Sequence, residues 1–202
     1  MINNDVLRSV RFMLDLADAT IIEVSKLADP AFDLVRDDVA AYLKREGDDG
    51  FEECPDEVLA HFLDGLVIHY RGVDPTRPPR PVDKRITNNL VLKKLRVAFE
   101  LKDGDMHQAF ADAGHPVSKP ELSAFFRQPG HKNYRACGDQ LLRNFLKGLT
   151  MRSHLRAGSP CRTKRRSSSN ARASSAARSG TLTPRPATTT VSHSTVPVLI
   201  VR

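Results

Sequence analysis

The sequence has no tryptophan, few aromatic residues and no long apolar run. Its 202 residues include nine Phe and three Tyr, so any core must be largely aliphatic. No stretch approaches the roughly 20 apolar residues of a membrane span. The first five residues also lack the basic and apolar pattern of a secretory signal. The sequence therefore predicts a protein that has no membrane partner.

Cysteine is equally scarce. Cys54, Cys137 and Cys161 are far apart and form neither a CxxC pair nor a zinc-binding pattern. The chain also has no GxGxxG, GxxxxGK[ST] or GxSxG motif. We therefore expect a cytoplasmic protein with reduced thiols. We also expect no cofactor, no metal site and no catalytic residue, so that the protein is not an enzyme.

Acidic residues are absent from the last part of the chain. All 24 lie before residue 153, whereas residues 153–202 hold nine basic residues and are rich in Ser, Thr, Ala and Arg. Such a composition cannot bury enough apolar surface to fold, which predicts a disordered tail. Two interpretations of this tail remain open. It is a nucleic-acid-binding arm, or it is a frame-shift product of a GC-rich gene.

The rest of the chain contains an internal repeat. Residues 3–11 align with 88–96 at an offset of 85, and residues 54–66 align with 137–149 at an offset of 83. The two halves differ in charge, because residues 1–72 hold seven basic and 16 acidic residues, whereas residues 86–152 hold eleven and six. These observations divide the chain into four parts: an acidic repeat 1 (residues 1–72), a proline-rich linker (73–85), a basic repeat 2 (86–152) and the tail (153–202).

Apolar periodicity and helix-start residues predict four helices in each repeat. Their expected ranges are 4–16, 18–28, 37–46 and 56–71 in repeat 1, and 89–101, 103–113, 119–128 and 139–153 in repeat 2. The Asn pair that begins each repeat is expected to cap its first helix, and Thr87 strengthens this signal in repeat 2. Gly65 and Gly148 lie inside the fourth helices, which favours close packing between the two copies. The fold class is all-α: two tandem pseudo-symmetric four-helix repeats packed together, followed by the tail.

One loop of repeat 2 has the composition of an anion-binding surface. Residues 128–135 gather cationic and hydrogen-bonding side chains around one tyrosine, whereas the equivalent residues of repeat 1 are acidic. Neighbouring helices add further cations. The candidate residues for binding an anionic partner are Lys119, Arg127, His131, Lys132, Asn133, Tyr134, Arg135, Arg143 and Lys147. The alternative is an ordinary solvated loop between helices.

Two other features have a functional and a structural interpretation. Residues 106–123 resemble a helix-turn-helix, with Gly114 in the turn, although the turn is about two residues longer than usual. In the functional interpretation, the second helix of this segment enters the major groove of DNA. In the structural interpretation, the segment is only two helices joined by a short turn. Cys54 and Cys137 each precede a helix, where a nucleophile would have a lowered pKa. Neither has a matching histidine in both repeats, so a small half-buried structural residue is the better interpretation.

Three strings of repeat 2, residues 88–96, 119–135 and 137–146, resemble the bacterial YehS-like family. The resemblance extends over residues 1 to about 152. It implies a short cytoplasmic protein built from two copies of a domain of unknown function. It implies no activity, cofactor or catalytic residue. The tail has no counterpart in the family pattern.

These features lead to a leading hypothesis and an alternative. The first is a non-enzymatic binding or adaptor protein whose repeat 2 contacts RNA, DNA or another anionic partner. The alternative is a protein–protein interaction module, in which the acidic repeat of one copy meets the basic repeat of another and forms a homodimer by self-association.

Overall fold

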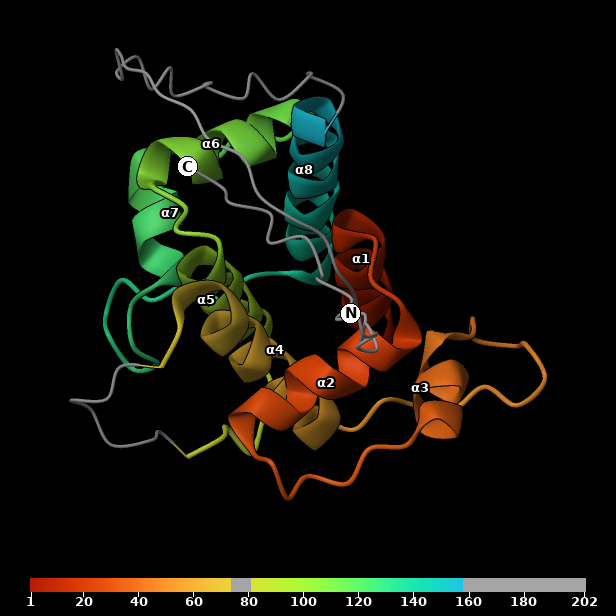
Figure 1. The fold of residues 1–202 in the computed structure, drawn as a ribbon. Helices are drawn as coiled ribbons and strands as arrows, with labels where there is room; N and C mark the ends of the chain where they lie inside the picture. The colour runs from red at the N-terminus through yellow and green to blue at the C-terminus, as the bar shows by residue number, and fades with distance from the viewer. Residues whose placement is uncertain (74–80, 158–202) are drawn as a thin grey trace, which may run out of the picture. The chain divides into compact units, whose positions relative to one another are not determined.

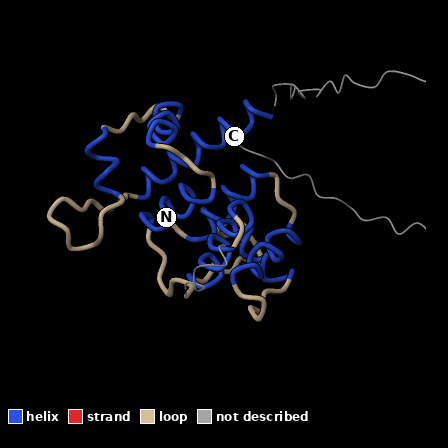
Figure 2. The backbone as a smooth tube through the Cα atoms, turned by 60° about the vertical axis from the view of Figure 1, so that its left-hand side comes forward, coloured by secondary structure: helices blue, strands red, loops and turns tan. Residues whose placement is uncertain are grey.

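The computed structural model describes residues 1–73 and 81–157, and within these ranges all regular structure is helical (Figures 1 and 2). Four helices form repeat 1: α1 (Asn3–Leu14), α2 (Asp18–Ala28), α3 (Arg36–Leu43) and α4 (Asp56–Arg71). Four more form repeat 2: α5 (Asn88–Ala98), α6 (Asp103–Asp112), α7 (Lys119–Phe125) and α8 (Asp139–Ala157). The predicted all-α fold with two tandem four-helix repeats is confirmed.

The helix ends differ from the predictions in the first, third and last helices. The first helices stop two and three residues earlier than predicted, at Leu14 and Ala98. The third helices stop earlier than predicted, at Leu43 and Phe125. In repeat 1 the helix ends because the next residue, Lys44, adopts an extended backbone conformation instead of a helical one. Helix α8 continues to Ala157 and so includes the first five residues of the predicted tail. The predicted disorder of residues 158–202 lies outside the described residues.

A single apolar core runs through both repeats. The first helices contribute matching stripes, with Leu7 and Val10 of α1 and Leu92 and Leu95 of α5 all fully buried. These residues recur at the three- and four-residue spacing of a core-facing helix. Phe62, Phe110, Phe125 and Phe145 are the largest of the fully buried side chains. The two repeats therefore bury their apolar faces against each other and within themselves.

The two repeats are joined through equivalent helix pairs. Helix α1 packs on α8, and its counterpart α5 packs on α4, so the first helix of each repeat meets the fourth helix of the other (Figure 1). Within each repeat, the second helix packs on the fourth, as α2 on α4 and α6 on α8. This exchange of equivalent contacts is the pseudo-symmetry that the sequence repeat predicts.

Gly65 and Gly148 mark close helix contacts, but these contacts lie inside each repeat. A Cβ on Gly65 would be 2.6 Å from the carbonyl carbon of Val24 in α2 and nearer still to its oxygen. A Cβ on Gly148 would meet Ala109 of α6 in the same way. The predicted close approach is therefore present, whereas its assignment to the packing between the copies is wrong. Sequence spacing alone does not say which helix approaches the glycine.

The same aspartate of each repeat links the two repeats at their helix starts. Asp56, the first residue of α4, accepts hydrogen bonds from Asn3 Nδ2 at 2.8 Å and from the backbone nitrogen of Ile86 at 3.2 Å. Asp139, the first residue of α8, likewise binds Asn88 Nδ2 at 2.7 Å and the Met1 nitrogen. Each carboxylate thus binds the first helix of its own repeat and a residue two positions before the first helix of the other.

The charges of the two repeats also meet inside the molecule. Lys94 of α5 binds Asp64 of α4, and Arg71 of α4 binds Glu100, which follows α5. At the other junction, Arg143 of α8 lies 3.4 Å from Asp5 of α1. Part of the opposite charge of the repeats is therefore neutralised between them within one chain. As to membranes, no helix in the described part of the chain is long and apolar enough to span one.

Candidate nucleic-acid interface

A buried asparagine holds the loop between the third and fourth helices in each repeat. In repeat 1, Asn4 Nδ2 donates to the carbonyl oxygens of Tyr42 at 2.9 Å and Glu52 at 2.7 Å. Its Oδ1 accepts from the backbone nitrogen of Cys54 at 2.9 Å. The side chain therefore satisfies one backbone group before the loop and two near its end, which fixes both ends of the loop to α1.

Repeat 2 has the same arrangement. Asn89 donates to the carbonyl oxygens of Phe125 at 2.9 Å and Arg135 at 2.8 Å, and accepts from Cys137 N at 2.8 Å. Glycines at equivalent positions adopt nearly the same left-handed conformation, with φ of +94° at Gly47 and +91° at Gly130. The two loops are thus held by the same contacts and turn at the same place.

The two loops differ in charge. Residues 127–138 of repeat 2 contain three basic and no acidic residues, whereas the equivalent residues 44–55 contain two basic and five acidic residues. The His131-Lys132 pair stands where repeat 1 has Asp48-Asp49. Because the loops share the same asparagine clamp, this difference changes the surface potential while the clamp is retained.

Six of the nine predicted binding residues lie on this loop, and Lys119 begins the helix α7 that precedes it. Arg127 Nη1 donates to His131 Nδ1 at 3.3 Å, and the backbone nitrogen of Asn133 donates to the same atom at 3.1 Å. Arg135 binds Glu121 of α7, two residues after Lys119. Lys119 and Lys132 are exposed, whereas Tyr134 is half-buried and less available for stacking on a base.

The other two predicted residues lie elsewhere. Arg143 and Lys147 are exposed on α8, and their neighbours are on α1. Within the described ranges, no hydrogen bond or ion pair joins either residue to the loop of residues 127–138. The predicted set therefore separates into a loop group and a pair on α8, which the two proposals below treat separately.

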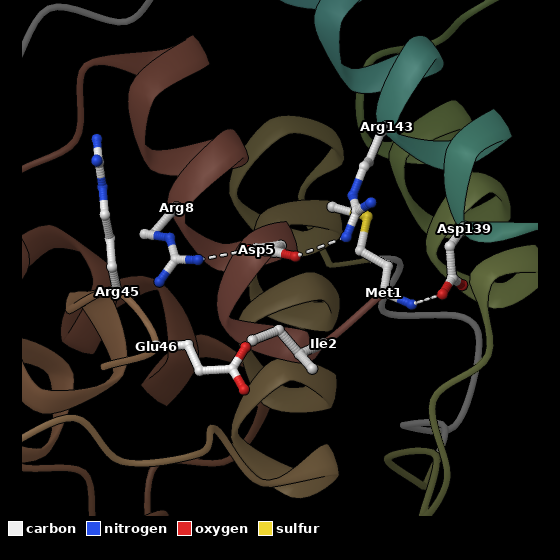
Figure 3. Close-up of a pocket in the computed structure, with 8 residues that line it drawn as sticks. All are labelled: Met1, Ile2, Asp5, Arg8, Arg45, Glu46, Asp139 and Arg143. Carbon is white, nitrogen blue, oxygen red and sulfur yellow. Dashed lines mark hydrogen bonds and ion pairs between the residues drawn. The ribbon is translucent and has the colours of Figure 1, made fainter. Parts of the chain in front are cut away.

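A polar hollow of about 520 Å³ lies next to the α8 pair (Figure 3). Asp5 binds Arg8 at 2.5 Å and Arg143 at 3.4 Å, and the Met1 nitrogen binds Asp139. The hydrogen bond from this nitrogen, and secondarily that from Asn88, lowers the pKa of the Asp139 carboxyl. The eight residues that line the hollow are Met1, Ile2, Asp5, Arg8, Arg45, Glu46, Asp139 and Arg143. Acidic and basic groups pair with each other here, which makes the hollow a junction between the repeats.

The helix-turn-helix-like segment consists of α6, a connection at residues 113–118 and α7. Gly114 has a φ of +82°, and the backbone nitrogens of Gly114 and His115 bind the carbonyl oxygens of Ala111 and Phe110. This is the glycine-terminated helix end that the sequence predicts. Helix α7 has only seven residues, with Leu122 and Phe125 facing the core. Contact of this segment with nucleic acid stays a prediction.

The asparagine pair has a different role from the predicted one. Asn3 and Asn4 lie inside the first turn of α1, whose N-cap position is Ile2, and they bind other elements instead of capping the helix. In repeat 2 the cap is Thr87, whose Oγ1 accepts from Leu90 N at 3.3 Å. A helix cap needs only one asparagine. The presence of two in both repeats was therefore the sequence signal that one of them has another role.

Cys54 and Cys137 have the environment of structural residues. They are 1% and 5% exposed. Burial, and secondarily the neighbouring Asp56 or Asp139 carboxylate, raises the pKa of each thiol to about 12. A nucleophilic cysteine needs a lowered pKa, so neither thiol suits such a role.

These thiols are therefore expected to resist alkylation until the protein unfolds. In a Cys161→Ser variant at pH 8, the thiolate fraction of the folded protein should be on the order of a thousandfold below that of an ordinary cysteine. Rapid reaction with a thiol reagent before unfolding would contradict this. Folding raises the pKa of both thiols above the value of the unfolded chain. The contribution of the protonated thiols to the free energy of unfolding is therefore complete at pH values below the unfolded pKa. It should be lost as the pH rises from about 8.5 towards the folded value of about 12.

Comparisons with known proteins agree with the repeat. Residues 3–72 and 88–154 match the family described as "Protein of unknown function (DUF1456)". The chain is 42% identical to the "Uncharacterized protein YehS" of Escherichia coli (strain K12) over 158 residues, which cover 78% of this chain and all of that protein. No solved structure matches. The chain belongs to the DUF1456 family, of which it contains two copies of the domain in tandem.

Proposed function

We propose that this protein is a non-enzymatic cytoplasmic binding protein whose repeat 2 contacts the phosphate backbone of nucleic acid. The α7–α8 loop, residues 126–138, makes the contact. The observation that carries the proposal is the comparison of the two loops: the same asparagine clamp holds both, yet one bears three basic and no acidic residues and the other five acidic residues. Such a difference at a fixed backbone favours recognition of an anion by repeat 2.

The geometry of the loop suits backbone contact more than base reading. Lys119 and Lys132 are exposed, and Arg135 is held in place by Glu121. Lys and Arg contacts to phosphate supply affinity that depends on salt and not on base sequence. Because Tyr134 is half-buried and α7 is short, the surface has little to read base edges with. We therefore expect binding with weak sequence preference.

The alternative, self-association through opposite repeats, has less support. The ion pair between Lys94 and Asp64 joins the basic and acidic repeats of the same chain. These charges are thereby already partnered and add little to attraction between copies. Among the described residues, no carboxylate pairs with Lys132 of the α7–α8 loop or with Lys119 of α7, so both lysines remain available to an external anion.

The proposal is tested by measuring the affinity for a labelled single-stranded RNA at several salt concentrations. The fragment of residues 1–157 contains all eight helices and excludes the basic residues beyond them. Lys119→Ala together with Lys132→Ala should weaken binding and lower the slope of log affinity against log salt by about two, one for each phosphate contact. The control is Lys26→Ala, which removes an exposed lysine of repeat 1.

Three results would contradict the proposal. One is equal binding by the double variant and the wild-type fragment. Another is an equal loss in the Lys26→Ala control, which would reflect net charge alone. The third is binding by the full chain but not by residues 1–157, which would assign the activity to the residues beyond α8.

A further inference from the structure

A shallow groove between α1 and α8 has an apolar floor and two cations at its edge. Its volume is about 280 Å³. Leu146 forms part of the floor, and Met151 is 43% exposed. The lining residues are Ser9, Phe12, Arg143, Leu146, Lys147, Thr150 and Met151. Apolar side chains at a surface beside unneutralised charge are typical of interaction sites.

The pseudo-symmetric junction between α4 and α5 indicates what such a groove accepts. There, Lys94 stands in the place of Ser9 and Asp64 in the place of Lys147, at the repeat offsets of 85 and 83. Lys94 binds Asp64 and also Asp83, whose Oδ2 lies 2.9 Å from its Nζ. Asp83 belongs to the linker, and both it and Val82 are half-buried. The chain thus places its own acidic residue, next to a branched apolar residue, at this junction.

The α1–α8 junction has a different arrangement, because Ser9 replaces the cation Lys94 and the cation Lys147 replaces the acid Asp64. Lys147 is exposed, and among residues 1–73 and 81–157 no carboxylate pairs with it. Arg143, which also lines the polar hollow of Figure 3, is 52% exposed and meets Asp5 only at 3.4 Å. Repeat 2 therefore offers two cations beside an apolar floor, where the other junction has an internal acid.

We propose that the α1–α8 groove binds a short acidic segment of a partner protein, in which an Asp or Glu adjoins a branched apolar residue. The acid meets Lys147 and Arg143, and the apolar side chain lies against Leu146 and Met151. The inference is independent of the nucleic-acid proposal, since it uses other residues and an apolar floor that a phosphate backbone would not need.

The test is an NMR titration of the full-length, ¹⁵N-labelled protein with a synthetic peptide, Glu-Pro-Val-Asp-Glu-Leu. Its amide shifts should cluster at Ser9, Leu146, Lys147 and Thr150. A peptide with Asn in place of Asp and Gln in place of both Glu residues is the matched control. Lys147→Asp gives α8 the residue that α4 has at Asp64, and should weaken binding at least about tenfold. Because Lys147 is exposed, the melting temperature of this variant should stay close to that of the wild type.

The other outcomes would overturn the inference. Shifts confined to the α7–α8 loop would assign the acidic peptide to the cationic loop. Equal binding of the neutral peptide, or unchanged affinity in Lys147→Asp, would show that the cations do not recognise the acid. Shifts at the groove that depend on protein concentration without peptide would identify a second copy of this chain as the occupant.

Discussion

Gly65→Ala is expected to lower the free energy of unfolding by about 3 kcal/mol, at the upper end of the usual cost of overpacking. The new methyl group would overlap the backbone carbonyl of Val24, so α2 and α4 would have to separate. Backbone cannot give way by a rotamer change, unlike a flexible side chain. The gain of about 1 kcal/mol in helix propensity from Gly to Ala offsets only part of this cost. Gly148→Ala should behave alike, because it meets Ala109 in the same manner.

Chemical denaturation monitored by circular dichroism measures this effect. Gly104→Ala is the matched control, because Gly104 also lies in a helix, α6, but an added Cβ would meet nothing within 4 Å. This control should be unchanged or up to about 1 kcal/mol more stable. A Gly65→Ala protein as stable as the control would show that the close helix contact does not exist.

Asn4→Ala is the second substitution with a large expected effect, a loss of about 3 kcal/mol of stability. Asn4 is fully buried, and its removal leaves the carbonyl oxygens of Tyr42 and Glu52 and the nitrogen of Cys54 without their partner. Each buried polar group left without a partner costs about 1–3 kcal/mol, less where water can enter. Leucine at this position would fill the volume and leave the same groups unsatisfied.

The equivalent residue of repeat 2 provides a graded comparison. Asn89 makes the same three hydrogen bonds but is only half-buried, so water can replace part of them. Asn89→Ala should therefore cost less than Asn4→Ala, and exposed Asn133→Ala should cost little. Denaturation midpoints that rank the three variants in another order would refute the clamp as the main role of these asparagines.

Much of the fold could be predicted from the sequence, because the relevant signals are local and occur twice. The apolar stripes of α1 and α5, the glycine end of α6 and the helix start at Asp139 all depend on neighbouring residues. An internal repeat also gives two independent readings of each helix. Helix positions were therefore predicted well, with the main errors at the C-terminal ends of α1, α3, α5, α7 and α8.

Long-range partners could not be predicted in the same way. Gly65 signals a close neighbour without naming α2, and Arg11 was not assignable to Asp18, which it binds at 3.0 Å across the turn between two helices. The same holds for the candidate site. Composition identified the cations, but only the structure separates Arg143 and Lys147 from the loop.

The two repeats retain their supporting contacts and differ in the charge that these contacts present. Asn4 and Asn89 hold equivalent loops, and Asp56 and Asp139 join equivalent helix starts. A duplicated domain can keep its stability in this way while one copy acquires a new surface charge. The function proposed for repeat 2 requires that the charge of its loop, and not its backbone, decides whether RNA binds.

The most direct test of this account is to exchange the loop charges and measure RNA affinity in residues 1–157. A first variant carries His131→Asp, Lys132→Asp and Arg135→Glu, the residues found at the equivalent positions of repeat 1. A second adds Asp48→His, Asp49→Lys and Glu52→Arg. The account predicts that the first variant loses RNA binding at least tenfold, because it removes the phosphate contacts of Lys132 and Arg135 and adds three carboxylates. The second variant should regain binding through repeat 1. Unchanged affinity in the first variant would contradict it.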